Sequence, residues 1–422
     1  MKPPPHVSAT MPLTTPFHSR VEAQNQAGLW KHWAGYLVPP QYQHSLTAEY
    51  YAIRNSVSLL DTTPLFKYKI TGSDVERFLG RVLARDIAGC PPGRAQYTCW
   101  CDECGFVLQD GVIMQVDEGE YWLTAAEPTL RYFRVVARDM GANVEIEDVS
   151  RAFGILALQG PHAHRVISQL TDDATPLRYF SVARTEIEGC PVVVSRTGYT
   201  GDLGYELWIP AQDACTVWDA VMDAGRGHNI TPIGTTALKM ARIEAGLLLM
   251  GADFHSSRFA WVDEQRETPV ELGWSWMFRT LADDDRDFVG RTAIESELHE
   301  RTSRWTTVGL AVDWHDYERV YTDAGVVPPR HEVYSESTMS IYRRGTTEWD
   351  YAGYASSFTT SSLMRIPLAI AKLPLDLAGP GTEVDLEVTV IRRPQNVLAR
   401  VERMPFFNPA LKTAPMAEEG RS

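Results

Sequence analysis

Residues 195–209 read Ser195-Arg-Thr-Gly-Tyr-Thr-Gly-Asp-Leu-Gly-Tyr-Glu-Leu-Trp-Ile209, and they are the most informative stretch of the chain. They follow an apolar, β-branched run at 191–194, and large apolar side chains alternate again over 205–209. This pattern predicts the two strands of a hairpin. The loop has a glycine at every third position, which suits a backbone that takes positive φ or approaches a ligand closely. These glycines are Gly198, Gly201 and Gly204.

Glu206 is the carboxylate within the second strand of this hairpin. Strand alternation turns its side chain away from those of Tyr205 and Leu207. A buried carboxylate at this position needs hydrogen-bond donors, because an unpaired charge in an apolar strand is costly. The alternative is that Glu206 faces solvent and that the glycines only shape a turn. The spacing alone leaves both interpretations open.

The composition is that of an ordinary soluble protein with two or three domains, because 422 residues exceed one typical core and 44% of them are hydrophobic. The formal net charge of -14 disfavours nucleic acid or an anionic membrane as the main partner. No apolar run reaches the roughly 20 residues that cross a bilayer. The first residues contain no apolar signal core, so we expect a cytoplasmic location.

Six cysteines in a chain of this length do not suggest a disulfide framework. Cys99, Cys101 and Cys104 form a C-x-C-x-x-C cluster, but no fourth ligand stands at a recognisable spacing. We therefore expect free, buried or half-buried thiols and no metal site.

The order of strand and helix patterns predicts an α+β body followed by a small antiparallel barrel or sandwich. The expected helices cover 49–57, 75–82, 214–222 and 235–249, and the expected strands cover 66–70, 155–158, 307–312, 384–391 and 397–404. The expected divisions are a flexible N-terminal segment (1–15), two parts of the body (16–150 and 151–300), a C-terminal barrel (301–410) and a flexible tail (411–422).

Two polar residues interrupt apolar patterns elsewhere. Asp110 lies between apolar pairs in the expected strand 106–113, beside Gly111. It is either a surface residue at a strand kink or an inward acid that can accept a substrate proton. Arg242 shares the apolar face of the helix 235–249, where it either extends to the helix edge or directs a positive charge into a site.

Several segments taken together resemble the tetrahydrofolate-dependent aminomethyltransferase family, which includes the T-protein of the glycine cleavage system. They occur in family order between about residue 40 and residue 408. The matching segments are Ala157-Leu-Gln-Gly-Pro161, Arg196 to Leu207, Arg242-Ile-Glu-Ala-Gly246, Asp287-Phe-Val-Gly-Arg291 and Met404-Pro-Phe-Phe-Asn408.

The resemblance implies an α+β fold of three domains, arranged as a cloverleaf around a channel that holds tetrahydrofolate, with a small β-barrel at the C-terminus. It implies that Glu206 accepts two hydrogen bonds from the 2-amino group and the ring N–H of the pterin, a charge-assisted contact. Asp110 matches the acid beside the reacting N5 atom, where it can act as a base or stabilise positive charge. Tyr97, Tyr199 and Trp274 match residues that line the folate pocket.

The chain departs from the T-protein pattern at the central helix, where Leu238 stands in place of an arginine. Arg242 lies one turn further along the same face and could supply part of the missing charge. The usual pair of aspartates is Gln109-Asp110 here. The opening residues 15–22 resemble the dimethylsulfoniopropionate-demethylase branch, which also lacks the helix arginine.

These features lead us to expect a demethylase that moves a methyl group from a small sulfonium, amine or aryl ether to N5 of tetrahydrofolate. Some of the many tryptophans could contact a cationic methyl donor, although tryptophans are more often core or channel wall. The candidates are Trp100, Trp122, Trp274 and Trp276. One alternative is an aminomethyltransferase that takes its unit from a lipoyl carrier protein. The other is a folate-binding protein without catalytic activity. The sequence does not identify the donor or the oligomeric state.

Overall fold

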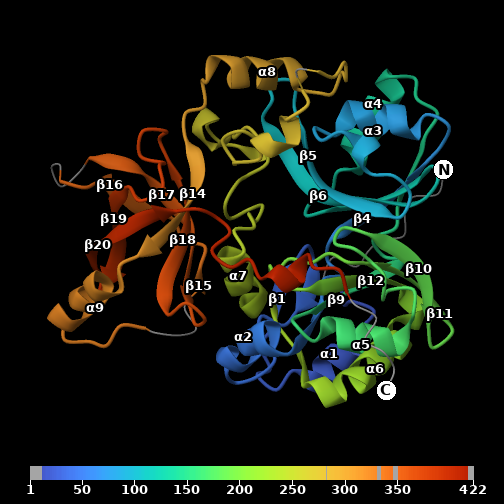
Figure 1. The fold of residues 1–422 in the computed structure, drawn as a ribbon, viewed down its shortest axis with the longest axis horizontal. Coiled ribbons are helices and arrows are strands. Elements are labelled where there is room, and N and C mark those ends of the chain that lie inside the picture. The colour runs from blue at the N-terminus through green and yellow to red at the C-terminus, as the bar shows by residue number, and fades with distance from the viewer. Residues whose placement is uncertain (1–11, 282, 330–333, 346–349, 417–422) are drawn as a thin grey trace.

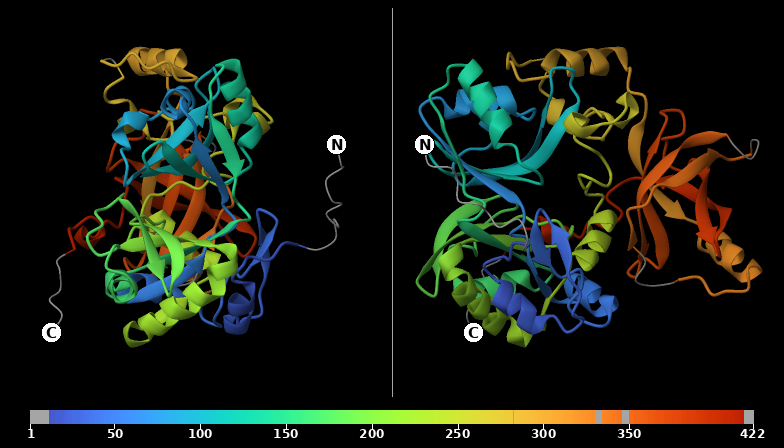
Figure 2. Two further views of the ribbon diagram at one scale, coloured as in Figure 1. Left: turned by 90° about the vertical axis from the view of Figure 1, so that its right-hand side faces the viewer. Right: turned by 180° about the vertical axis from the view of Figure 1, so that it is seen from behind.

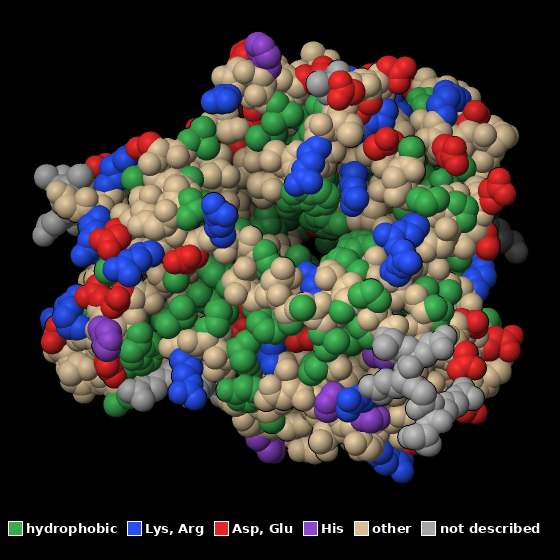
Figure 3. Space-filling view, viewed as in Figure 1, with side chains coloured by type: hydrophobic (Ala, Val, Ile, Leu, Met, Phe, Trp, Pro, Cys, Tyr) green, Lys and Arg blue, Asp and Glu red, His purple; other side chains and the backbone are tan. Residues whose placement is uncertain are grey.

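The computed structural model describes residues 12–281, 283–329, 334–345 and 350–416. These residues form three lobes arranged around a common centre (Figures 1 and 2). In the space-filling view the centre of the molecule is hollowed between the lobes, and apolar side chains line the hollow (Figure 3). No helix within the described ranges is both long enough and apolar enough to span a bilayer.

The first lobe is built on a six-stranded sheet with strand order β10-β11-β12-β9-β3-β13, in which only the β13–β3 pair is parallel. One face packs on α1, α5 and α6, and the other packs on α2 and α7. A two-stranded hairpin, β1–β2, lies beside it. The bounds are α1 (His18–Gln24), β1 (Lys31–Trp33), β2 (Tyr36–Val38), α2 (Leu46–Asn55), β3 (Val57–Asp61), β9 (Phe153–Gln159), α5 (Ala163–Leu170), β10 (Val182–Ile187), β11 (Cys190–Ser195), β12 (Gly204–Pro210), α6 (Ala214–Gly225), β13 (Ile230–Pro232) and α7 (Thr235–Glu244).

The second lobe is built on a five-stranded antiparallel sheet with strand order β5-β6-β7-β4-β8. Its outer face packs on α3 and α4, and its inner face meets the irregular segment 248–288 and α8. The bounds are β4 (Phe66–Thr71), α3 (Val75–Val82), β5 (Arg94–Cys101), β6 (Val107–Asp117), β7 (Glu120–Ala125), α4 (Leu130–Asp139), β8 (Glu145–Asp148), the 3-10 turn η6 (Ser275–Phe278) and α8 (Arg291–Glu300).

The third lobe is a closed barrel of six strands, because β18 pairs with β14 on one side and with β17 on the other. The strand β15 adds to β17, and α9 packs its Tyr317 and Val320 side chains into the barrel core. The bounds are β14 (Thr306–Val312), α9 (Trp314–Asp323), β15 (Tyr334–Ser335), β16 (Met339–Arg343), β17 (Tyr351–Ser361), β18 (Ile366–Leu373), β19 (Glu383–Val390) and β20 (Arg393–Glu402). The predicted α+β class with a C-terminal β-barrel is confirmed.

The hairpin predicted around residues 195–209 is present, with Val193 opposite Trp208 and Ser195 opposite Glu206. Gly201 takes φ +78°, and a Cβ atom there would collide with the Cβ of Ala245. This close approach places the loop directly against the end of α7. Glycine is therefore required at this position for both conformation and space.

Two predicted helix boundaries were wrong. The helix expected at 49–57 ends at Asn55, and residues 57–61 form β3, because they pair with β9 and β13 inside the sheet. The helix expected at 235–249 ends at Glu244, and Gly246 follows with φ +63°. A residue with positive φ is typical of helix ends, and Leu249 consequently lies outside the helix.

The lobes are not contiguous in sequence. The chain passes from β3 of the first lobe (residues 57–61) into β4 to β8 of the second lobe and returns to the first lobe at β9. The boundary expected at residue 150 falls at this return, and an earlier crossing lies between β3 and β4.

Residues near both ends of the described chain make specific contacts. Thr15 is buried and donates to Asp61 at 2.6 Å, and the carbonyls of Leu411 and Ala414 accept hydrogen bonds from Arg196. These contacts involve single residues near each end, and the expected flexible segments stay a prediction.

Candidate active site

Glu206 lies on the face of the first sheet that is turned away from α5 and α6. Its neighbours Tyr205 and Leu207 are buried in the core beneath those helices, whereas Trp208 contacts the second sheet. The sequence prediction that Glu206 points away from this core is therefore confirmed. The side chain is half-buried, and burial raises the pKa of its carboxyl group.

One oxygen of Glu206 is already bound within the protein. The hydroxyl of Thr197 donates to Oε2, and Ser195 lies 2.7 Å from the same hydroxyl. Among the described residues no donor reaches Oε1. A partly exposed carboxylate oxygen held in a fixed orientation can accept N–H groups from a ligand.

Tyr97 and Asp110 form a hydrogen-bonded pair on the inner face of the second sheet. The phenol of Tyr97 donates to Oδ2 of Asp110 at 2.7 Å. Tyr97 is opposite Val112 and Cys99 is opposite Asp110 in regular register, and the irregularity of the β5–β6 pairing lies further along, between Trp100 and Cys101. Strand alternation therefore places Asp110 on the face that Tyr97 shares. Asp110 is thus the inward acid of the two sequence alternatives.

Burial raises the pKa of Asp110 from 3.8 to about 6, and the Tyr97 hydroxyl partly offsets this rise. Burial and the neighbouring carboxylate raise the pKa of Tyr97 well above its usual range, so the phenol stays protonated and remains a donor. A carboxylate with a pKa near 6 can accept and release a proton close to neutral pH.

Aromatic side chains surround this pair. Trp274 meets the Tyr97 ring edge-on at 5.5 Å and the Phe254 ring at 5.3 Å. Tyr199, from the loop that precedes Glu206, donates its hydroxyl to the carbonyl of Leu248. Burial is the main cause of the raised pKa of Tyr199, and Asp110 is near enough to contribute to it. The structure therefore brings four of the predicted site residues together, while no hydrogen bond or ion pair joins Glu206 to Asp110 within the described chain.

Comparisons with known proteins identify the family of the chain. Residues 17–280 match the family model described as the GCVT N-terminal domain. An aminomethyltransferase of Geobacillus kaustophilus is 31% identical over 90% of this chain and 94% of its own length. The chain belongs to the aminomethyltransferase family. The corresponding protein of Bacillus subtilis is 28% identical over 89% of this chain and 94% of its own length. The crystal structure of the glycine cleavage system aminomethyltransferase T of Bartonella henselae superposes with a TM-score of 0.78 at 20% identity, covering 94% of this chain and 99% of that one.

The family and the transferase class predicted from the sequence are thus confirmed. The comparisons do not single out the demethylase branch. Tetrahydrofolate, the substrate that the family implies, fits the residues present. Glu206 offers an oxygen that no donor among the described residues reaches, and Tyr97, Tyr199 and Trp274 are aromatic side chains of the kind that can pack on a pterin ring.

Arg242 does not fit the ligand-binding role expected from the sequence. Its side chain is completely buried, and it forms an ion pair with Asp253. It also donates to Ser357 of the barrel at 2.6 Å. The adjacent carboxylate raises the pKa of Arg242, so its charge is permanent and is neutralised inside the protein. Arg242 therefore joins α7 to the barrel and does not replace the arginine missing at Leu238.

Sequence reasoning missed the acidic residues that complete this buried interface. Asp253 also accepts hydrogen bonds from Ser356 and from the backbone of Leu249. Glu244 accepts hydrogen bonds from Arg54 at 2.6 Å and from Ser361 at 2.6 Å. The signal in the sequence was a set of charged residues within apolar patterns, but only the fold shows which charges meet.

The predicted tryptophans divide into two groups. Trp100 packs on Phe133 in the core beneath α4, and Trp122 packs on Trp208 between the two sheets, so neither faces the channel. Trp274 forms an aromatic wall with Tyr97 and Phe254 and is 7% exposed. Trp276, two residues further along, is 37% exposed.

All six cysteines are free thiols. Cys99 and Cys101 are buried as expected, but Cys104 is exposed. Across the described residues, no group of three or more His, Cys, Asp or Glu side chains is arranged to hold a metal ion.

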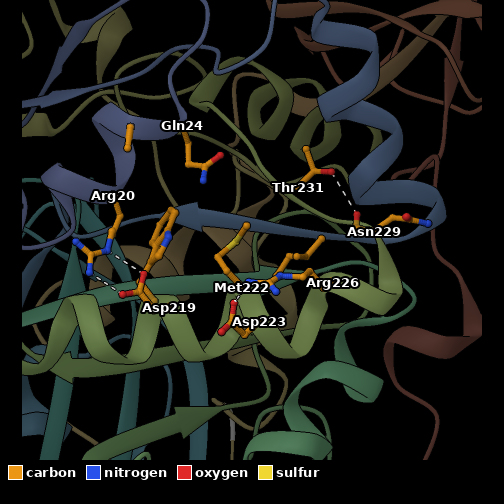
Figure 4. Close-up of a pocket in the computed structure, with 11 residues that line it drawn as sticks. Arg20, Gln24, Asp219, Met222, Asp223, Arg226, Asn229 and Thr231 are labelled. Atoms are coloured by element: carbon orange, nitrogen blue, oxygen red, sulfur yellow. Dashed lines mark hydrogen bonds and ion pairs between the residues drawn. The ribbon is translucent and has the colours of Figure 1, made fainter.

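A surface hollow of about 740 Å³ lies elsewhere, between α1 and α6 (Figure 4). Its charged side chains already pair with each other, since Arg20 contacts Asp219 at 2.6 Å and Arg226 contacts Asp223. It contains none of the predicted site residues, so the channel between the lobes remains the candidate active site.

Proposed function

We propose that this protein transfers a one-carbon unit to N5 of tetrahydrofolate. The observation that carries this proposal is the pair of complementary features around one channel: the available carboxylate oxygen of Glu206 and the Tyr97–Asp110 pair with a pKa of about 6. Tetrahydrofolate supplies the nucleophilic nitrogen. Glu206 orients the pterin, the aromatic wall excludes water, and Asp110 holds or accepts the proton beside the reacting nitrogen.

Aminomethyl transfer is the first candidate reaction, because the curated relatives that cover nine-tenths of the chain are named aminomethyltransferases. In this reaction the donor is an aminomethyl group on a lipoyl carrier protein, and ammonia is released. The catalytic geometry of Tyr97 and Asp110 also argues against a folate-binding protein without activity.

Methyl transfer from a small sulfonium, amine or aryl ether is the second candidate. It is favoured by Leu238, which offers no charge, and by Arg242, whose charge Asp253 neutralises. A channel without this arginine differs from the T-protein pattern at the helix that faces the folate. We further propose a cytoplasmic location.

The deciding experiment incubates the protein with tetrahydrofolate and either an aminomethyl-loaded lipoyl carrier protein or a panel of methylated donors. Release of ammonia with 5,10-methylenetetrahydrofolate supports the first candidate, and formation of 5-methyltetrahydrofolate supports the second. If neither product forms and tetrahydrofolate does not bind, the proposed function is wrong.

A further inference from the structure

Arg85 and Trp276 form a cation–π pair next to the candidate active site. The guanidinium carbon of Arg85 lies 5.1 Å from the centre of the Trp276 ring. The same guanidinium donates through Nη1 to the carbonyl oxygen of Tyr97 at 3.1 Å. Arg85 is therefore held by the backbone of the residue whose side chain binds Asp110.

This pair forms a second layer outside the aromatic wall. β5 is the edge strand of the second sheet, and the chain at Ala84 runs along its free edge, donating to the carbonyl of Cys99 at 2.9 Å. Trp274 contacts the side chain of Tyr97, and Trp276 follows it in η6. Exposure rises from 7% at Trp274 to 37% at Trp276, so the Arg85–Trp276 layer is the one nearer to solvent.

The charge of Arg85 has no carboxylate partner among the described residues. Two neighbouring arginines on this side of the lobe do have one, since Arg81 contacts Asp287 at 2.7 Å and Arg286 contacts Asp284 at 3.0 Å. Arg85 is half-buried, and this burial lowers its pKa. A partly desolvated guanidinium without a counter-charge is an unfavourable arrangement that an incoming anion relieves.

The geometry suits a carboxylate in particular. The cation–π contact with the indole ring and the hydrogen bond to the Tyr97 carbonyl hold the guanidinium at two points, and only one N–H is used by that carbonyl. The remaining N–H groups keep the fork geometry that binds two carboxylate oxygens. Figure 3 shows Lys and Arg side chains beside the apolar hollow at the centre of the molecule, whereas the chain as a whole carries a net charge of -14.

We propose that Arg85 and Trp276 form a carboxylate-binding subsite at the margin of the channel, one layer outside Tyr97 and Asp110. This inference rests on the proposed function, because it assigns the subsite to a ligand that reacts at Asp110. The carboxylate belongs either to the glutamyl end of the folate or to the one-carbon donor, and one set of variants distinguishes the two sources.

The first arm measures binding of tetrahydrofolate and of tetrahydropteroate, which lacks the glutamyl group, by titration calorimetry. The test variant is Arg85→Gln, and the matched control is Arg131→Gln, which removes an exposed arginine from α4 on the opposite face of the sheet. If the folate supplies the carboxylate, Arg85→Gln weakens tetrahydrofolate binding by about 10- to 100-fold and leaves tetrahydropteroate binding unchanged.

The second arm measures binding of two methylated donors to the tetrahydrofolate-saturated protein. Dimethylsulfoniopropionate carries a carboxylate, and trimethylsulfonium does not. If the donor supplies the carboxylate, Arg85→Gln weakens binding of the first compound by a similar factor, leaves the second unchanged and does not alter tetrahydrofolate affinity.

The inference is overturned if Arg85→Gln changes the affinity for neither tetrahydrofolate nor dimethylsulfoniopropionate. It is also overturned if Arg85→Gln weakens binding of tetrahydropteroate as strongly as binding of tetrahydrofolate. The latter result means that Arg85 only supports the Tyr97 backbone. Arg85→Lys keeps a positive charge and serves as the test variant if Arg85→Gln does not fold; it is expected to retain part of the carboxylate affinity. If the wild-type protein binds neither pterin, the proposed function fails first, which separates that failure from failure of the subsite.

Discussion

Replacing Glu206 is the most direct test of how the channel holds the pterin. Its Oε2 accepts from Thr197, and Oε1 has no donor among the described residues, so the protein holds the carboxylate in one orientation before any ligand arrives. Each hydrogen bond to a charged acceptor contributes about 1.5–3 kcal/mol. Loss of both pterin contacts in Glu206→Ala therefore costs about 3–6 kcal/mol, a reduction in affinity of roughly 100- to 10,000-fold.

Glu206→Gln separates charge from shape. The amide keeps one acceptor oxygen but presents an N–H₂ group where the second pterin N–H would bind, so we expect about 10- to 1,000-fold weaker binding, between wild type and Glu206→Ala. The matched control is Glu186→Gln, which removes an exposed carboxylate from β10 of the same sheet and should leave affinity unchanged. Tetrahydrofolate binding by titration calorimetry is the assay. Wild-type affinity in Glu206→Ala would refute the assignment of Glu206 to the pterin.

Four further predictions follow from buried groups and from the close approach at Gly201. Asp110 must be ionised to accept a proton, so kcat/KM should rise with pH through about 6, and Asp110→Asn should abolish this rise. Folding raises the pKa of Asp110 above its unfolded value of 3.8, so ionisation of Asp110 lowers the stability of the fold as the pH rises from about 4 to 6, and the cost is complete above pH 6. Asp110→Asn should therefore increase the free energy of unfolding by up to about 3 kcal/mol at pH 8 and by almost nothing at pH 4. Equal gains at both pH values would contradict the pKa shift. Arg242→Met should lower the free energy of unfolding in urea by about 3–5 kcal/mol, because it leaves the buried Asp253 carboxylate without its ion-pair partner. The control Arg319→Met removes a surface ion pair and should lower the free energy of unfolding by at most about 1 kcal/mol. Similar losses in the two variants would show that the buried pair is not important for stability. Gly201→Ala should lower the thermal unfolding midpoint, because its Cβ overlaps Ala245, by an amount that corresponds to about 1–3 kcal/mol, and an unchanged midpoint would mean that the loop can move away from α7.

Local patterns were sufficient where neighbouring residues decide the structure. The β-branched run and the alternation around Glu206 predicted β11 and β12, because strand pairing across a short loop depends on residues close in sequence. The same reasoning failed at residues 57–61, because pairing with two distant strands there outweighs the tendency to continue a helix. Alternation also placed Glu206 opposite the core, but it did not show that one oxygen would be bound by Thr197 and the other left available.

By itself, the sequence determined the class of fold, the hairpin and the residue types that folate chemistry requires, because these depend on periodicity and on motifs in a fixed order. Only the tertiary structure decided which charges are available to a ligand. It neutralises Arg242 with Asp253, a residue eleven positions away whose role no pattern indicates, and within the described part of the chain it pairs Arg85 at the edge of β5 with no carboxylate. The physical reason is that a buried charge is controlled by the groups packed around it, and three lobes supply those groups from distant parts of the chain.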